Sequence, residues 1–291
     1  MKITIFTLFP EMFDGFKTNS IIKRAIGNNV VEINIVNIRD YTIDKYGRVD
    51  TPPIGGGAGL IMKCQPIVDA LKKNTNNKTH KILLSPKGKQ YNQSIAKKLA
   101  KLDDIAMICG HYEGIDERIN NYVDESISIG DYVLTGGEIA AMAIADSVIR
   151  LRDGAITNIS LEEETFDDNL LEYSQYTEPK EFDGHKVPDI LYTGNHQAIK
   201  KFRRKEALKI TRERRPDMFE KHVLTKEDIK TFDKHSYYSI MAPVFQDVNL
   251  FAMSFKENVA MQEIEKINTE NNIVFFINNR IYKFRYLYSG I

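Results

Sequence analysis

The chain has 291 residues, and its 40 Lys and Arg balance its 40 Asp and Glu, so the formal net charge is zero. Hydrophobic residues make up 42% and charged residues 27%, which is typical of a globular protein and excludes a low-complexity or fibrous chain. No apolar run approaches the ~18 residues of a membrane helix, and Pro10 interrupts the N-terminal apolar run, unlike a secretory signal. The two cysteines show no zinc-type spacing with the six histidines and fit a reducing cytosol. We therefore expect a cytoplasmic protein with no membrane segment.

The first half of the chain alternates between β-type and helix-type segments. We expect strands at 2–8, 31–37, 81–85 and 105–110, and helices at about 16–26, 65–74 and 91–101, with a glycine loop at 47–59. Strands that alternate with helices in this rhythm are typical of an α/β domain with a parallel sheet.

A glycine pair joins a β-type run to a helix-type run in the middle of the chain. The β-type run 127–134 leads directly to the helix-type run 139–149, with Gly136 and Gly137 at the junction. Such glycines adopt backbone angles that other residues avoid, and they let a ligand approach the main chain. Two earlier strands end at Ser85 and Gly110. Because ligands collect at the carboxyl ends of parallel strands, we expect these segments to line one pocket.

The second half of the chain is more polar. Residues 152–188 read as an interdomain linker with one short helix at most, and residues 194–235 as helices with a break at Arg215–Pro216. Within 200–215, nine Lys and Arg face two Glu, a net charge of +7. Such a run is either a solvated helix face or a contact for a polyanion.

The last segment, residues 236–291, differs in composition from what precedes it. We expect a charged helix at about 256–268 and a β-hairpin of 273–277 and 280–288 around Asn278–Asn279. This segment is either a small packing appendage or a surface on which basic residues between aromatics, such as Arg280, Lys283 and Arg285, touch RNA.

Several blocks carry a family resemblance. They are CGHYEGIDER from Cys109, SIGDYVLTGGE from Ser128, ITIFTLFPEMF from Ile3, GGGAG from Gly55 and TGNH from Thr193. In this order they resemble the bacterial tRNA (guanine-N1)-methyltransferases of the TrmD type over about residues 1–235. The resemblance implies a SPOUT-like parallel sheet with a C-terminal trefoil knot, a small helical domain and a short α+β tail. The expected domains are a knotted methyltransferase domain at 1–160, a linker at 161–188, a tRNA-binding domain at 189–235 and an extension at 236–291.

The resemblance implies an S-adenosylmethionine pocket at the strand ends. Apolar walls for the adenine would come from Ile129, Tyr132 and Leu134, and Glu113 would lie near the sulfonium, with a plain ion pair to Arg118 as the alternative. The full expected set is Leu84, Ser85, Pro86, Gly110, Tyr112, Glu113, Ser128, Ile129, Gly130, Asp131, Tyr132, Val133, Leu134, Gly136 and Gly137.

The resemblance also assigns catalytic roles. Removing the proton of guanine N1 needs a carboxylate base, and a cation must stabilise charge on O6. The matching positions are Glu164 and Arg150. The family has aspartate where Glu164 stands, and also at Glu172, and the extra methylene moves a base by more than ~1 Å. These departures question the catalytic efficiency of the chain.

RNA contacts are expected from the glycine loop and from the basic segment. The glycine loop lacks the Gly-Lys-Ser/Thr ending of a phosphate loop, so the resemblance places it near the target nucleotide. The expected residues are Asp50, Gly59, Asn195, His196, Lys201, Arg204 and Lys205. The resemblance implies a homodimer with shared sites, and Mg²⁺ that helps the reaction without dedicated protein ligands. The alternatives are a SPOUT methyltransferase with another target and a tRNA-binding paralogue without catalysis.

Overall fold

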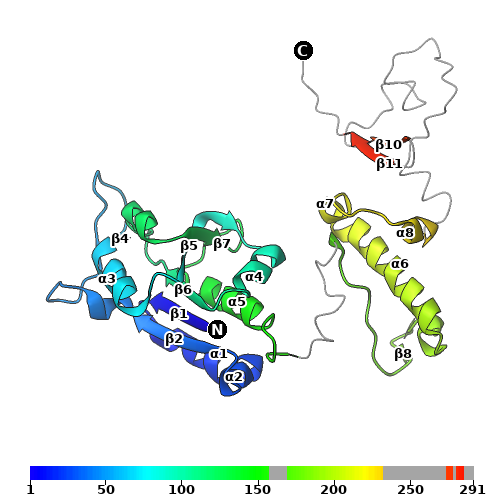
Figure 1. Cartoon of the computed structure of the whole chain (residues 1–291), viewed down its shortest axis with the longest axis horizontal. Coiled ribbons are helices and arrows are strands. Elements are labelled where there is room, and N and C mark those ends of the chain that lie inside the picture. The colour runs from blue at the N-terminus through cyan, green and yellow to red at the C-terminus, as the bar shows by residue number, and fades with distance from the viewer. Residues whose placement is uncertain (157–168, 232–272, 278–279, 285–291) are drawn as a thin grey trace, which may run out of the picture. The chain divides into compact units, whose positions relative to one another are not determined.

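The computed structural model describes residues 1–156, 169–231, 273–277 and 280–284. The chain divides into two compact units, Met1–Glu162 and Glu163–Ile291 (Figure 1). The predicted base Glu164, the predicted helix at 256–268, the turn at 278–279 and the strand end at 285–288 lie outside the described residues.

A five-stranded sheet forms the centre of the first unit, and all four of its strand pairings are parallel. The order is β2-β1-β6-β5-β7. The strands are β1 (Lys2–Thr7), β2 (Glu32–Asn37), β5 (His80–Gln90), β6 (Asp104–Cys109) and β7 (Glu125–Ser128). The predicted parallel α/β architecture is therefore confirmed for this unit.

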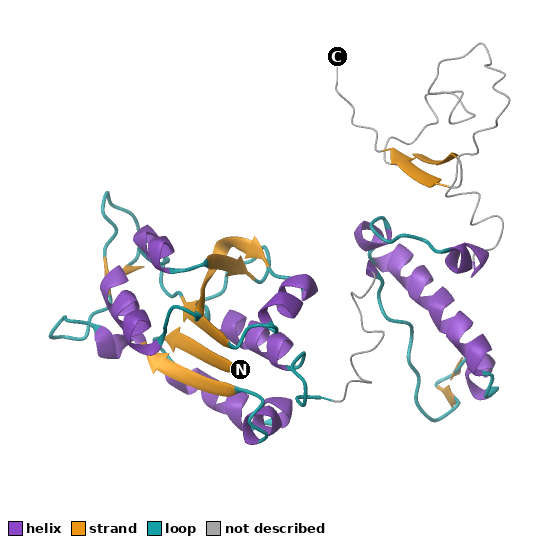
Figure 2. Ribbon diagram, in the orientation of Figure 1, coloured by secondary structure: helices purple, strands orange, loops and turns teal. Residues whose placement is uncertain are grey.

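Helices cover both faces of this sheet, and Figure 2 shows them around the strands. On one face, side chains of α2 (Ser20–Gly27), α4 (Gln93–Leu99) and α5 (Glu138–Ile149) share a core with alternate residues of β1 and β6. On the other face, α3 (Cys64–Asn74) packs against the intervening residues of the same strands. Strands covered on both faces need apolar residues at almost every position, as β6 has in its Ile105–Cys109 run.

Three expectations about element ends were wrong. The strand expected at 81–85 continues to Gln90 as β5, with an irregularity between Leu84 and Lys89 where it pairs with β7. The single helix expected at 16–26 is divided into α1 (Asp14–Thr18) and α2, because Asn19 is extended and Ser20 has a φ of 54°. The β-type run expected to continue to Leu134 ends at Ser128, and a nine-residue loop leads from there to α5. Short strands β3 (Asp50–Thr51) and β4 (Ile61–Met62) flank the glycine loop as an antiparallel pair.

The second unit is built around α6 (His196–Arg214). The helix ends where the sequence predicts, at Arg215–Pro216, and α7 (Pro216–Phe219) and α8 (Lys226–Thr231) follow. The chain before it holds a short antiparallel pair, β8 (Glu181–Phe182) and β9 (His185–Lys186), and a 3₁₀ turn at Asp189–Tyr192. The predicted hairpin forms as β10 (Ile273–Ile277) and β11 (Arg280–Phe284).

Part of the predicted linker packs along α6. The Leu171 amide donates to the Thr211 hydroxyl at 2.8 Å, and the Arg203 guanidinium lies 4.7 Å from the ring centre of Tyr173. Leu170 is buried. This polar segment is therefore an extended stretch of chain that lies along α6. Its described residues, from 169 onward, belong to the second unit.

Candidate active site

The middle of β5 lies beside the carboxyl ends of β6 and β7. Leu84 of β5 pairs with Cys109 of β6 on one side and with Ile127 of β7 on the other. Ser85–Pro86, Gly110 and Ser128 follow directly after these paired residues. The structure thus brings together the three segments that the sequence predicted to form one pocket, but Ser85–Pro86 lies within β5, which continues to Gln90, and the predicted strand end there was wrong.

The Gly136–Gly137 turn is fastened to the end of β6. The Gly137 amide donates to the Gly110 carbonyl at 2.8 Å, and Gly136 forms a β-bridge with His111. A Cβ on Gly137 would lie 2.7 Å from the Cys109 Cα. Gly137 itself has ordinary helical angles, φ −80° and ψ −6°. Glycine is therefore required at 137 by close packing, and the expectation that it needs special backbone angles was wrong there.

In the loop after β7, the glycine with a positive φ is Gly130, seven residues before Gly137. Gly130 has a φ of 157°, and a Cβ there would lie 2.4 Å from the Tyr132 ring. The Ser128 hydroxyl donates to the Gly130 carbonyl at 3.0 Å. Tyr132 is 55% exposed and Val133 is 84% exposed. Of the three expected apolar walls, Ile129 packs against the core while Tyr132 lies largely in solvent.

The glycine loop reaches the expected cofactor residues. A Cβ on Gly59 would lie 2.5 Å from the Glu113 Cγ, and the Glu113 amide donates to the Leu60 carbonyl at 3.0 Å. Asp50 lies on the same hairpin, paired with Met62. Tyr112 has a φ of 60°, a strained conformation for a non-glycine residue and one that concentrates at functional sites. The expected target-nucleotide loop and the expected cofactor residue Glu113 are therefore neighbours.

Arg118 pairs with a different carboxylate from the one considered in the sequence. Its Nε and Nη2 atoms donate to Asp116 at 2.9 and 2.5 Å. The hydrogen bonds from Arg118 lower the pKa of Asp116 to about 2. Asp116 therefore already balances the charge of Arg118, and the alternative role for Glu113, an ion pair with Arg118, is not needed.

A buried polar group beneath the glycine turn was missed by sequence reasoning. Glu138 is 2% exposed, and its carboxylate accepts a 2.7 Å hydrogen bond from Thr7, which is 131 residues earlier in the chain. His111 Nδ1 is buried without a partner, and a Cβ on Gly136 would lie within 3 Å of both this atom and Glu138 Oε2. Burial, with the nearby Glu138 charge, raises the pKa of the Cys109 thiol. Polar atoms and bare glycines at one strand end fit a polar cofactor such as S-adenosylmethionine.

Arg150 lies at the opposite end of α5 from this turn. It caps the C-terminus of the helix, and its amide donates to the Asp146 carbonyl at 3.0 Å. Since α5 has 12 residues, its two ends are about 18 Å apart. Within one chain, the structure therefore does not bring Arg150 to the glycine turn.

In the second unit, α6 presents a basic face. The Asn195 side chain accepts from the Ala198 amide at 3.1 Å and caps the helix, and His196 is its exposed first residue. Lys201, Lys205 and Lys209 are exposed at four-residue spacing, which places them along one side. Arg204 instead donates to both oxygens of buried Asp228, at 2.6 and 2.9 Å. Its guanidinium thus serves an ion pair inside the unit.

Two further properties concern metals and membranes. Among the described residues, His, Cys, Asp and Glu side chains form no group of three or more that could hold a metal ion. The expected Mg²⁺ therefore has no protein ligand set in this part of the chain, and no step of the reaction is assigned to it. No helix within the described ranges is long and apolar enough to cross a membrane.

Comparison with known proteins gives a consistent result. The family described as tRNA (Guanine-1)-methyltransferase TrmD matches residues 1–221. A tRNA (guanine-N(1)-)-methyltransferase of Clostridium perfringens strain SM101 is 56% identical over 79% of this chain and 98% of its own length. Enzymes of the same name from Clostridium acetobutylicum (54% identical, 79% and 96% covered) and Clostridium botulinum strain 657 (53%, 80% and 99%) are similar. The chain therefore belongs to the TrmD family of tRNA (guanine-N1)-methyltransferases, S-adenosylmethionine-dependent enzymes that act on tRNA.

Proposed function

We propose that the chain methylates N1 of the guanosine directly 3′ of the tRNA anticodon, position 37. The observation that carries this proposal is the contact between the glycine loop at Gly59 and Glu113, beside the carboxyl ends of β6 and β7 and the middle of β5. That contact puts a loop suited to the target nucleotide next to segments suited to the methyl donor. When bound, S-adenosylmethionine supplies an electrophilic methyl group on its sulfonium.

The residues of the cofactor site bind and orient the donor. The bare backbone at Gly110 and Gly136 is suited to hydrogen bonding with the adenine edge, and the Glu113 carboxylate is suited to hold the cationic sulfonium by charge. Ile129 and Leu134 flank the same loop. Holding donor and acceptor in line is the main contribution that such a rigid turn makes to a methyl transfer.

The proton on guanine N1 must leave for the methyl to arrive. We assign the removal of this proton to the Glu164 carboxylate, acting as general base. We assign the stabilisation of the negative charge that develops on O6 to the Arg150 guanidinium. Both roles rest on the family resemblance, since Glu164 lies outside the described residues and Arg150 lies at the far end of α5.

The position of Arg150 supports a homodimer in which two chains share each site. Arg150 lies about 18 Å along α5 from the glycine turn of its own chain. For Arg150 to act at a glycine turn, that turn must belong to a second copy. Two exposed apolar residues, Met12 and Ile139, lie on neighbouring elements of the first unit and offer a surface for a second copy. Closed two-fold symmetry is the commonest arrangement for such pairs.

The path of β5 supports the trefoil knot. Ile127 of β7 pairs with both Leu84 and Lys89, so the intervening residues of β5 bulge around β7. A Cβ on Gly88 would lie 2.5 Å from the Ile127 amide nitrogen. The chain after β7 then returns to β6 through the Gly137–Gly110 hydrogen bond. A trefoil knot requires the chain to pass closely beside an earlier loop, and the close approach of β7 to the bulged part of β5 is consistent with such a path.

The tRNA backbone would lie on α6. Lys201 and Lys205 present exposed cations toward phosphates, while Asn195 and His196 stand at the helix start, where backbone amides and the helix dipole favour anions. Asp50 and Gly59 lie near the target nucleotide on the first unit. A tRNA substrate places the reaction in the cytoplasm.

Methyl transfer to a set of tRNA transcripts tests this proposal. We expect single-turnover transfer to a transcript with guanosine at position 37, with 1-methylguanosine mapped to that nucleotide, and none to the same transcript with adenosine there. Equal transfer to both transcripts would favour a family member with another target. Cofactor and tRNA binding with no transfer at all would favour the non-catalytic paralogue.

A further inference from the structure

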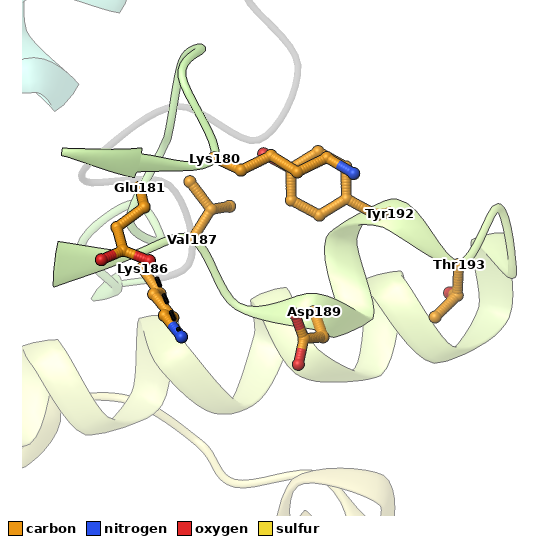
Figure 3. A pocket seen from close by; sticks show the side chains of 7 residues that line it. All are labelled: Lys180, Glu181, Lys186, Val187, Asp189, Tyr192 and Thr193. Carbon is orange, nitrogen blue, oxygen red and sulfur yellow. Dashed lines mark ion pairs between the residues drawn. The ribbon is translucent and has the colours of Figure 1, made fainter. Parts of the chain in front are cut away.

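The second unit contains a pocket of about 390 Å³ that lies just before α6 (Figure 3). The β8–β9 pair forms one side, and the 3₁₀ turn at Asp189–Tyr192 forms the other. Its size falls within the range of small-ligand sites. The lining residues are Lys180, Glu181, Lys186, Val187, Asp189, Tyr192 and Thr193.

The pocket combines an aromatic face with polar groups of both signs. Tyr192 is 42% exposed, and the Lys180 ammonium lies 4.5 Å from the centre of its ring (Figure 3). Lys186 pairs with Glu181 at 3.7 Å, and Asp189 adds a second carboxylate. Two lysines and two acids give no net charge. The pocket therefore does not attract a phosphate by charge. It is better suited to a flat group that stacks on the ring and has hydrogen-bond donors and acceptors on its edge.

The pocket lies beside the 3₁₀ turn that leads into α6. The turn that carries Tyr192 packs against α6 and leads through Gly194 to the Asn195 cap. The first lysine of the exposed row, Lys201, lies within two turns of that cap. Phosphate contacts position a nucleic acid and base contacts specify it, so the two features divide the work of one RNA-binding surface.

We propose that this pocket takes one unpaired base of the tRNA, stacked on Tyr192, while Lys201 and Lys205 hold the adjoining phosphates. This inference rests on the proposed function, because it assumes a tRNA on α6. Unpaired loop bases are commonly recognised by stacking on an aromatic ring with hydrogen bonds at the base edge. Lys180 covers the ring through an exposed cation–π contact, which is weaker than base stacking and yields to it.

The salt dependence of RNA binding distinguishes a base contact from a phosphate contact. In the full chain, Tyr192→Leu should weaken binding of an anticodon stem-loop RNA about tenfold at every salt concentration. The slope of log affinity against log salt should stay at the wild-type value, because every phosphate keeps its lysine. Tyr192→Phe should bind like wild type, and Tyr176→Leu is the matched control, since Tyr176 is 43% exposed and lies outside the pocket.

A scan with abasic RNA identifies the base. Removing one loop base at a time should reveal one position at which Tyr192→Leu causes no further loss of affinity, because its partner is already absent. Wild-type affinity in a folded Tyr192→Leu protein, or additive losses at every position, would overturn the inference. Methyl transfer and tRNA binding by the wild-type protein separate the two proposals. If wild type methylates guanosine 37 and the scan is additive, only the base pocket is wrong; if wild type binds no tRNA, both proposals fail.

Discussion

Gly137 and Gly136 are adjacent, yet substitution should affect them differently. A Cβ on Gly137 would lie 2.7 Å from the Cys109 Cα and 3.0 Å from the Gly110 nitrogen, which are backbone atoms at the carboxyl end of β6. A Cβ on Gly136 would instead meet the side-chain atoms Glu138 Oε2 at 2.3 Å and His111 Nδ1 at 2.8 Å. Side chains rotate away from a clash more readily than the backbone of β6 moves.

We therefore expect Gly137→Ala to abolish S-adenosylmethionine binding, or weaken it more than about tenfold, with tRNA affinity retained. Gly136→Ala should be milder, and Gly136→Val should also abolish cofactor binding because its branched side chain crowds the ligand. Titration calorimetry on variants whose melting curves show a folded protein checks this. Unchanged cofactor affinity in folded Gly137→Ala would contradict the pocket assignment.

Glu164 carries the prediction about proton transfer. If it is the general base, Glu164→Gln should leave both ligands bound and slow single-turnover methyl transfer about a hundredfold or more. Glu164→Asp should be much milder, and it can even accelerate the step, because it restores the shorter carboxylate of the family.

Glu163→Gln is the control for Glu164 and should cost little. A slow Glu163→Gln with a normal Glu164→Gln would shift the assignment by one residue. If neither changes the rate, Glu172 is the next candidate; its carboxylate accepts a hydrogen bond from Gln175.

At the scale of elements, the exposed lysines of α6 make a salt-dependent prediction. Replacing Lys201, Lys205 and Lys209 together with Ala should weaken tRNA binding and reduce the log–log salt slope by roughly 0.7–0.9 for each phosphate that is no longer neutralised. Replacing Lys72, Lys78 and Lys101 of the first unit, which are also exposed, removes the same charge elsewhere. Equal slopes for the two triple variants would mean that the α6 lysines are merely solvated. Arg204 is omitted because Asp228 holds it.

The Arg204–Asp228 pair should stabilise the packing of α8 on α6. Burial alone would raise the pKa of Asp228, but hydrogen bonds from Arg204 and Thr225 outweigh it and hold that pKa below its usual range. A lowered pKa means that the pair contributes stability above about pH 4, and that this contribution is lost as the pH falls further. The loss of stability begins where an unfolded Asp would take up a proton.

Arg204→Met should therefore destabilise the second unit by about 3 kcal/mol at pH 7, since it removes the guanidinium that donates to both oxygens of this buried carboxylate. Amide hydrogen exchange in α6 and α8 of the full chain measures this, and the variant should show a flatter pH dependence below about pH 4. Arg203→Met is the control, because its exposed contact with Tyr173 contributes less than about 1 kcal/mol. Equal protection in the two variants would show that the Arg204–Asp228 pair does not stabilise the unit.

The sequence predicts elements better than it predicts their contacts. The alternation of apolar runs and helix-type segments was enough to expect the parallel sheet, and Arg215–Pro216 was enough to end α6. The hydrogen bond between Thr7 and Glu138 could not be predicted, because nothing local relates residues so far apart. The end of β7 was misplaced for a similar reason. Tyr132 and Val133 have β-type side chains but lie exposed in a loop, because β propensity has little effect where a side chain has no neighbouring strand to pack against.

At the scale of the whole molecule, the proposed mechanism depends on two chains sharing each active site. The glycine turn and Arg150 stand at opposite ends of α5, so one chain does not unite them. We consider two variants, Gly137→Val, which lacks a cofactor turn, and Arg150→Ala, which lacks the proposed cation. In a mixed dimer of the two, one site combines both defects and the other site combines neither.

Co-expression of the two variants with different tags tests the shared site, because the mixed dimer can be purified and its methyl transfer compared with each parent. We expect both parent proteins to be nearly inactive and the mixed dimer to recover about half of the wild-type rate, since one of its two sites is intact. A mixed dimer no more active than its parents would mean that each site is built within one chain, and the shared site would then be wrong.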